Sequence, residues 1–210
     1  MAKKAQPAAR PSLIVVDALM ALAAERGWLA VSLADIAERA GLSLADLHDQ
    51  YPSKSAILAA YRESLDVAVL RGDPLDREAS SRDRLFDVVM RRFDAMQPHR
   101  DGIRAVLRDS MVDPWTLLCG APHLLGSAAL MLEAAGISAS GPAGRLKTKG
   151  LAALYLSILR TWLGDDAPDM AKTMAALDRA LRRIESVALF VCRTRRRPPP
   201  GGEHPEAVKS

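Results

Sequence analysis

The spacing of apolar residues along the chain predicts a protein built of helices. Apolar positions recur at steps of three and four residues, the period of an amphipathic α-helix, and no segment alternates apolar and polar residues as a half-buried strand does. Glycine and proline interrupt this pattern and divide it into segments. We therefore predict helices over about 12–26, 32–40, 43–51, 53–70, 81–97, 101–110, 114–135, 145–163 and 168–193.

Two short helices near the N-terminus begin with the same four residues. Ser32-Leu-Ala-Asp35 and Ser43-Leu-Ala-Asp46 each predict a capping box, in which the serine and the carboxylate bond each other's backbone N–H. Gly41 ends the first helix because glycine adopts positive φ at little cost, and Pro52 cannot continue the second. Two helices of about two turns at this spacing are typical of a helix-turn-helix.

The segment from Pro114 to Leu132 carries no charged residue. Its length approaches that of a membrane-spanning helix, but glycine, serine and histidine interrupt its apolar character. We therefore predict a buried helix or a pocket wall, kinked at Pro122, and no integral membrane segment. The final helix carries an apolar stripe, which is typical of a core or a dimer seam: Met170, Met174, Leu177, Leu181, Ile184, Ala188 and Val191.

Composition narrows the functional classes. The 210 residues are 49% hydrophobic but only 4% aromatic, so the predicted core is rich in leucine and alanine. Two cysteines, Cys119 and Cys192, form neither a disulfide framework nor a metal-binding spacing, and they fit a reducing cytoplasm. Motifs of zinc proteases, serine hydrolases and phosphate loops are absent from the sequence. We expect no catalytic residue, no metal and no cofactor.

The net charge of +4 suggests a polyanionic partner, but the excess lies at the two ends of the chain. Residues 1–11 and residues 193–210 each carry +3, and the segment between them carries −2. We predict a flexible arm over 1–11, a helix-turn-helix domain over 12–53, a larger helical domain over 54–193 and a disordered tail over 194–210.

Several motifs over residues 13–61 resemble those of one known family. The first helix ends in Glu25-Arg-Gly-Trp28, the turn reads Ala40-Gly-Leu-Ser43, and Tyr51-Pro-Ser-Lys54 follows the second short helix. This combination resembles the TetR family of one-component transcriptional regulators. The resemblance implies an all-α, TetR-like fold with an N-terminal three-helix DNA-binding domain. It also implies a DNA operator, a small apolar effector, and a homodimer formed through the last two helices.

The resemblance also implies which residues face DNA, and here the sequence departs from the family pattern. Leu44 stands where lysine is common, His48 where tyrosine is usual, and Asp49 where a basic residue is common. Residues 12–51 carry a net charge of −4, although DNA-binding proteins gain affinity by neutralising phosphates. The predicted DNA-binding residues are Ser32, Ser43, Leu44, Ala45, His48, Gln50, Tyr51 and Lys54.

A second resemblance keeps an alternative function open. The segment from Trp162 to Leu181, with Trp162-Leu-Gly-Asp-Asp-Ala-Pro-Asp169, resembles the C-terminal part of the ubiquinone-biosynthesis accessory proteins, and Gln97-Pro-His-Arg100 also fits. Those proteins have a TetR-like fold and bind lipids instead of DNA. The alternative is therefore a lipid-binding accessory protein without specific DNA binding.

The predicted effector-binding residues are Phe93 and three residues of the uncharged segment, Trp115, Cys119 and His123. For His99 and His123, a role as polar anchors competes with the more frequent role of a surface or hydrogen-bonded histidine. Arg91 and Arg92 either meet an acidic effector or lie on a solvated helix face, and we expect the solvated face because long charged side chains are usually exposed.

Overall fold

The computed structural model describes residues 13–72, 76, 78–110 and 114–195, and the side chains of 114–120 and 187–195 lie outside the description. Within these ranges the chain is helical, which confirms the predicted all-α class. The helices are α1 (Leu13–Arg26), α2 (Leu33–Ala40), α3 (Leu44–Gln50), α4 (Lys54–Arg71), α5 (Ser81–Met96), the short 3₁₀ helix η1 (Gln97–His99), α6 (Arg100–Ser110), α7 (Pro114–Ala134), α8 (Gly141–Leu163) and α9 (Ala171–Arg195).

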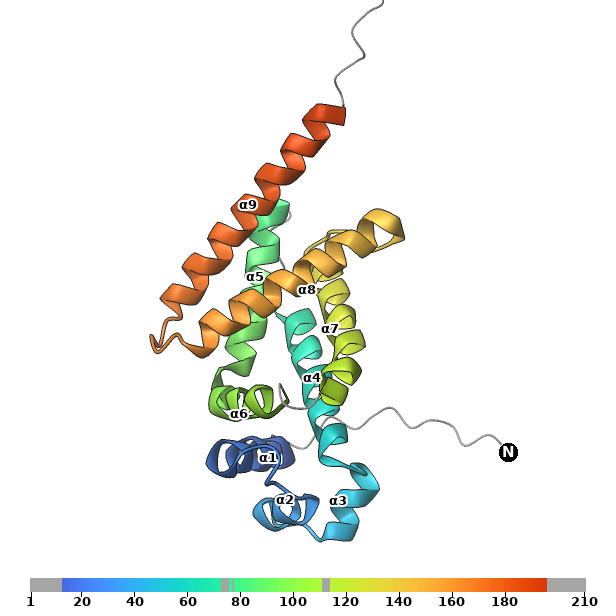
Figure 1. The fold of residues 1–210 in the computed structure, drawn as a ribbon, viewed down its shortest axis with the longest axis vertical. Helices are drawn as coiled ribbons and strands as arrows, with labels where there is room; N and C mark the ends of the chain where they lie inside the picture. Colours follow the sequence, from blue (N-terminus) through green and yellow to red (C-terminus); the bar gives the residue numbers. More distant parts are fainter. Residues whose placement is uncertain (1–12, 73–75, 77, 111–113, 196–210) are drawn as a thin grey trace, which may run out of the picture.

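Helices α1 to α3 form a small unit at one end of the molecule (Figure 1). Ser32 forms the full predicted capping box with Asp35. The second box is only half formed: the Ser43 hydroxyl accepts from the Asp46 backbone N–H, but the Asp46 carboxylate accepts the hydroxyl proton instead of the Ser43 backbone N–H. The two identical tetrapeptides therefore cap their helices by different bonding.

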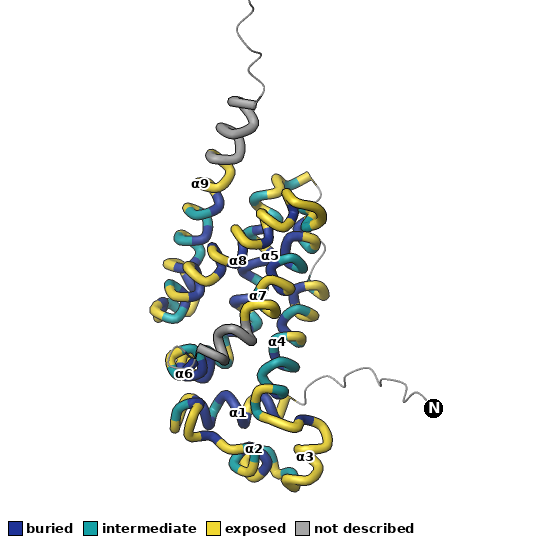
Figure 2. The backbone as a smooth tube through the Cα atoms, turned by 45° about the vertical axis from the view of Figure 1, so that its right-hand side comes forward, coloured by how far each residue is buried: buried dark blue, intermediate teal, exposed yellow. Residues whose placement is uncertain are grey.

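The larger unit is built around α4, α5, α7 and α8, and α9 packs against α5 and α8 (Figure 1). The dark, buried side of each of these helices faces its neighbours, while α3 at the opposite end is mostly exposed (Figure 2). The predicted stripe of α9 is only partly buried: Leu177 and Leu181 lie in the core, whereas Ile184 is 49% exposed.

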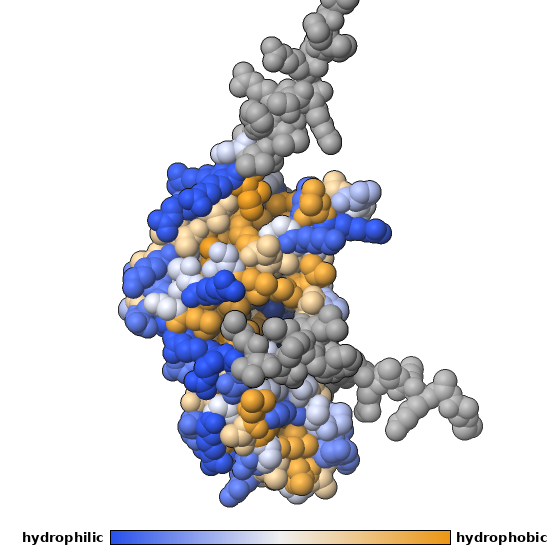
Figure 3. Space-filling model, in the orientation of Figure 1, coloured by the Kyte–Doolittle hydropathy of each residue, from blue (hydrophilic) through white to orange (hydrophobic). Residues whose placement is uncertain are grey.

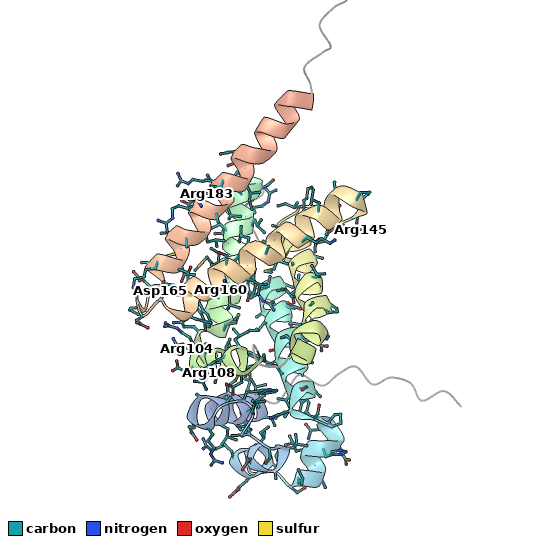
Figure 4. All side chains as sticks on the ribbon, viewed as in Figure 1. Arg104, Arg108, Arg145, Arg160, Asp165 and Arg183 are labelled. Atoms are coloured by element: carbon teal, nitrogen blue, oxygen red, sulfur yellow. The ribbon has the colours of Figure 1, made fainter. Side chains whose placement is uncertain are left out.

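Helix α6 lies between the two units and packs along α1. Gly102 makes this close approach possible, because a Cβ atom at that position would lie 2.5 Å from the backbone oxygen of Met20. At the next-to-last residue of α6, the Asp109 carboxylate accepts from the backbone N–H of Leu29, in the α1–α2 connection. Arg100 and Arg104 of α6 donate to the carbonyl of Leu163, at the end of α8. Figure 4 labels Arg104, which lies between α6 and the end of α8.

Two sequence predictions are corrected by the structure. Helix α8 begins at Gly141, four residues before the predicted start, because Pro142 occupies the first turn, where its fixed φ suits a helix and its missing N–H costs nothing. Arg92 was expected on a solvated face, but it is buried. None of the described helices is long and apolar enough to cross a membrane.

Candidate functional site

Helix α3 presents most of its surface to solvent (Figure 2). Leu47 is fully buried and holds the helix against the small unit, whereas the side chains on the other sides are exposed. Leu44 is 49% exposed. The exposed residues include five of those predicted to face DNA: Ser43, Leu44, Ala45, His48 and Gln50. Ser32 is also exposed, at the N-terminus of α2.

Tyr51 and Lys54 have structural partners in the small unit. Tyr51 is buried. The Lys54 ammonium donates to the carbonyl oxygens of Trp28 and Val31, at 2.7 and 2.8 Å, and lies 4.7 Å from the centre of the Trp28 ring. Burial lowers the pKa of Lys54. Two of its three protons are therefore engaged in joining α4 to the α1–α2 connection.

Both arginines of the small unit are paired at its surface. Arg39 forms two hydrogen bonds to Glu25, and Arg26 lies 3.4 Å from Asp35. Helix α3 contains no lysine or arginine and carries the exposed Asp49. The exposed face of α3 is therefore suited to contacts with base edges or other polar groups more than to phosphate neutralisation.

A cavity of about 340 Å³ lies inside the larger unit. Its volume is near the lower end of the range of small-molecule sites, about 300–1,000 Å³. Helices α4 to α8 all contribute to its wall, and most of the lining side chains are apolar. They are Leu58, Tyr61, Arg62, Leu65, Arg92, Met96, Ile103, Val106, Leu107, Ser110, Ala121, His123, Leu124, Ser127, Met131, Tyr155, Leu156 and Leu159.

Two arginines lie in this apolar wall. The side chain of Arg92 is 5% exposed, forms an ion pair with Asp66, and lies 3.4 Å from the Ser127 hydroxyl, which itself donates to Asp66. Burial lowers the pKa of Arg92, but the nearby Tyr155 and Asp66 oxygens outweigh burial and raise it. Arg62 forms no ion pair with any described residue, and its Nε, like that of Arg92, is buried without a hydrogen-bond acceptor.

The predicted effector-binding residues differ in their relation to the cavity. His123 lines it, in the uncharged segment of α7, which confirms that this segment forms a pocket wall. Phe93 does not line it, because the ring is fully buried behind the wall, stacked on Tyr155 at 5.2 Å. The side chains of Trp115 and Cys119 lie outside the described residues.

A chain of hydrogen bonds joins the cavity wall to α1. The Tyr61 hydroxyl lies 3.1 Å from Nδ1 of His99, and Nε2 of the same ring lies 2.8 Å from the Asp17 carboxylate. Burial raises the pKa of Tyr61, so its hydroxyl keeps its proton. His99 is thus a hydrogen-bonded histidine that connects the two units.

Comparisons with known proteins agree on one fold. Residues 15–61 match the family model of the bacterial regulatory proteins of the tetR family. A TetR transcriptional regulator from Nitrosomonas europaea ATCC 19718 superposes with a TM-score of 0.68 at 22% identity, covering 84% of this chain and 97% of its own. A TetR-family regulator from Streptomyces coelicolor gives 0.57 at 21% identity, with coverages of 88% and 87%. No match was found among curated proteins.

The N-terminal unit is a TetR-family domain. The described part of the chain has the TetR-like fold that the sequence predicted. A third regulator structure, from Rhodococcus sp. RHA1, superposes with a TM-score of 0.58 at 18% identity, with coverages of 81% and 92%. In this TetR-like fold α3 is the second helix of the helix-turn-helix, and the cavity lies in the larger unit. The family match and these structures are of regulators and lend no support to the lipid-binding alternative.

The segments that resemble the lipid-binding proteins have a structural role here. Trp162 is fully buried and donates from Nε1 to the Gln97 side chain at 2.9 Å, which joins the two resembling segments. Arg100 binds Asp166 in the same region. Asp165 accepts from the backbone N–H and the hydroxyl of Thr173, and so caps α9. These contacts account for the motif residues without a ligand.

Sequence reasoning placed neither arginine in the cavity, and it assigned Arg92 to a solvated helix face. Arg92 follows Val88 by four residues and precedes Met96 by four, so the helical period placed it on the buried side of α5. Arg62 stands in the same relation to Leu58, and precedes Leu65 by three. The helical spacing indicated a buried position, but arginine was expected to be exposed because of its residue type.

Proposed function

We propose that this chain is a one-component transcriptional regulator of the TetR type. It binds an operator as a homodimer through α3, and an effector in the cavity changes that binding. The observation that carries the proposal is the position of α6, which contributes to the cavity wall on one side and to the contact with the DNA-binding unit on the other.

The two faces of α6 follow from its residue spacing. Ile103, Val106 and Ser110 line the cavity at the spacing of one helix face. Gly102 and Asp109, two turns apart, contact α1 and the α1–α2 connection. An effector that binds more tightly to one position of α6 than to another therefore alters the orientation of α1. The difference in its affinity for the two positions limits how far the equilibrium between them can shift.

The hydrogen bonds from Tyr61 through His99 to Asp17 form a second connection, which does not pass through the cavity face of α6. A ligand that displaces the Tyr61 side chain breaks or lengthens the first of these bonds. The DNA-binding unit then responds through α1, the same helix that α6 contacts.

Exposed apolar side chains on the last two helices support the proposed dimer. Leu146 and Leu156 of α8 and Ile184 of α9 are 73%, 45% and 49% exposed. Apolar atoms reach the surface between these helices, bordered by hydrophilic side chains (Figure 3). A contiguous exposed apolar surface of this kind is typical of a protein–protein interface.

The proposal is tested by fluorescence anisotropy of labelled duplexes that tile the DNA upstream of the protein's own coding sequence. We expect one duplex to bind more tightly than a shuffled duplex of the same composition, with affinity falling as salt rises. The substitutions His48→Ala and Gln50→Ala should remove the preference, while Glu38→Ala on α2 serves as the exposed control. Equal affinity for all duplexes at low salt would overturn the proposal.

A further inference from the structure

The charges of the cavity wall identify the class of its ligand. We propose that the cavity binds an apolar molecule that carries a single carboxylate, with the carboxylate at Arg62 and the apolar part among the side chains of α6 and α7. This inference rests on the proposed function for its regulatory consequence, but not for the binding itself.

The charge balance of the wall favours an anion. The Arg92 charge is matched by Asp66, with which it forms an ion pair. Arg62 has no such partner among the described residues, and neither aspartate nor glutamate is among the described residues that line the cavity. Arg62 as a residue is only half-buried, but its Nε is buried without an acceptor. Desolvated charges in proteins are normally paired, so a ligand with one negative charge completes the site. A dianion would leave one negative charge unmatched.

Hydrogen-bond donors point to the same ligand class. The Nε atoms of Arg62 and Arg92 are buried and have no hydrogen-bond acceptor. The side chain of Arg92 is only 5% exposed. The Tyr155 hydroxyl, which also lines the cavity, donates to the sulfur of Met96, a weak acceptor. Burial of Arg62 beside Arg92 lowers its pKa, which a ligand carboxylate would reverse. The wall therefore has more donors than acceptors, as carboxylate recognition requires.

The rest of the wall selects an apolar body. Leucine, isoleucine, valine and methionine from α4 to α8 form most of the lining: Leu58, Leu65, Met96, Ile103, Val106, Leu107, Leu124, Met131, Leu156 and Leu159. These flexible aliphatic side chains offer dispersion contacts and no hydrogen bonds. A saturated chain of medium length with a terminal carboxylate matches both parts of the wall and the cavity volume of about 340 Å³.

Three probes with the same chain separate the effect of charge from that of the apolar body. Isothermal titration calorimetry with the full-length protein compares octanoate, 1-octanol and octylammonium. We expect octanoate to bind most tightly and octylammonium not to bind. Arg62→Gln should weaken octanoate binding about 10- to 100-fold, the effect of losing one charge-assisted hydrogen bond, and leave octanol unchanged. Arg71→Gln, an exposed arginine on the same helix outside the cavity, should change neither.

The outcomes distinguish this inference from the proposed function. Octanol binding as tightly as octanoate, no octanoate binding, or equal octanoate affinity in the Arg62→Gln and parent proteins would each overturn the carboxylate assignment. The operator-binding assay is run separately with and without octanoate. Octanoate binding without any operator-specific DNA binding would support the ligand class and contradict the regulator proposal.

Discussion

The exposed face of the DNA-binding unit and the wall of the internal cavity have opposite charge arrangements. Helix α3 carries Asp46 and Asp49 without a lysine or arginine, while the mostly apolar wall of the cavity contains Arg62 and Arg92. A net charge of +4 gives no hint of this arrangement. In this chain the location and pairing of each charge therefore decide its role. Salt screens an exposed charge, whereas a buried charge is normally matched by an opposite charge.

The largest expected effect on stability comes from removing Arg92, the buried cation that forms an ion pair with Asp66. Arg92→Leu leaves Asp66 and the Ser127 hydroxyl without their guanidinium, and should cost about 3 kcal/mol of unfolding free energy, the lower end for breaking a buried ion pair because Asp66 is partly exposed. Urea denaturation measures it. The double variant Arg92→Leu with Asp66→Leu should recover most of the loss. No recovery would contradict the assignment of the cost to the unmatched carboxylate.

The next effect tests the junction between the two regions. Gly102→Ala places a Cβ 2.5 Å from the Met20 carbonyl, so α6 and α1 must separate, at a cost of about 1–3 kcal/mol for overpacking. Gly150→Ala in α8 meets nothing within 4 Å, and should instead stabilise the protein by up to about 1 kcal/mol through helix propensity. Thermal unfolding of both variants gives the comparison. A stable Gly102→Ala protein would show that α6 does not depend on this close approach.

A third prediction concerns pH and the cap of α9. Burial raises the pKa of Asp165, but hydrogen bonds from Thr173 and Ala167 outweigh it and hold the pKa below its usual value. Its contribution to stability is therefore complete above the unfolded-state pKa, near 4, and is lost as pH falls through the lower folded-state value. Asp165→Asn should be less stable than the parent at pH 7 by about 1 kcal/mol, with the difference shrinking in acid. The parent and variant are compared by urea denaturation from pH 7 to pH 3, and a constant difference would exclude this titration.

The smallest expected effect is on the exposed face. Asp49→Asn removes one exposed negative charge from α3 and should tighten non-specific DNA binding by about two- to five-fold at low salt, because exposed charges interact weakly and are screened. Anisotropy with a shuffled duplex measures it, and the gain should disappear at high salt. Glu38→Gln, on α2, removes an equal charge away from α3. If this variant tightened non-specific DNA binding as much as Asp49→Asn, only net charge would matter.

The parts of the fold that depend on neighbouring residues in the sequence were predictable. Caps at Ser32 and Ser43 and the glycine stop at Gly41 are set by residues within one turn, so the helix-turn-helix followed from the sequence. The start of α8 was misplaced because Gly141-Pro142 is typical of both a turn and a first helical turn, and only the packing of the helix distinguishes them.

The cavity depended on tertiary contacts and was predicted only in outline. The uncharged segment of α7 was recognised as a pocket wall. Phe93 lies behind the cavity, because one face of α5 packs against Tyr155 of α8 while the face with Arg92 and Met96 lines the cavity. The ion pair between Arg92 and Asp66 joins residues on different helices, 26 positions apart. A single sequence contains no signal for such a pairing, and the engaged ammonium of Lys54, bound to carbonyls more than 20 positions away, illustrates the same limit.

Helix α6 contacts both the cavity and α1, and this has a consequence for how the protein can evolve or be redesigned. Substitutions in α7 and α8, such as at Leu124 or Leu159, can reshape the cavity without touching the DNA-binding unit. A change of volume at Val106 or Ser110 acts on both, since the helix that carries them is packed along α1 through Gly102. Under the proposed function, a search for variants that respond to a new ligand should therefore vary α7 and α8 and keep α6 fixed, so that ligand binding changes while the contact of α6 with α1 is preserved.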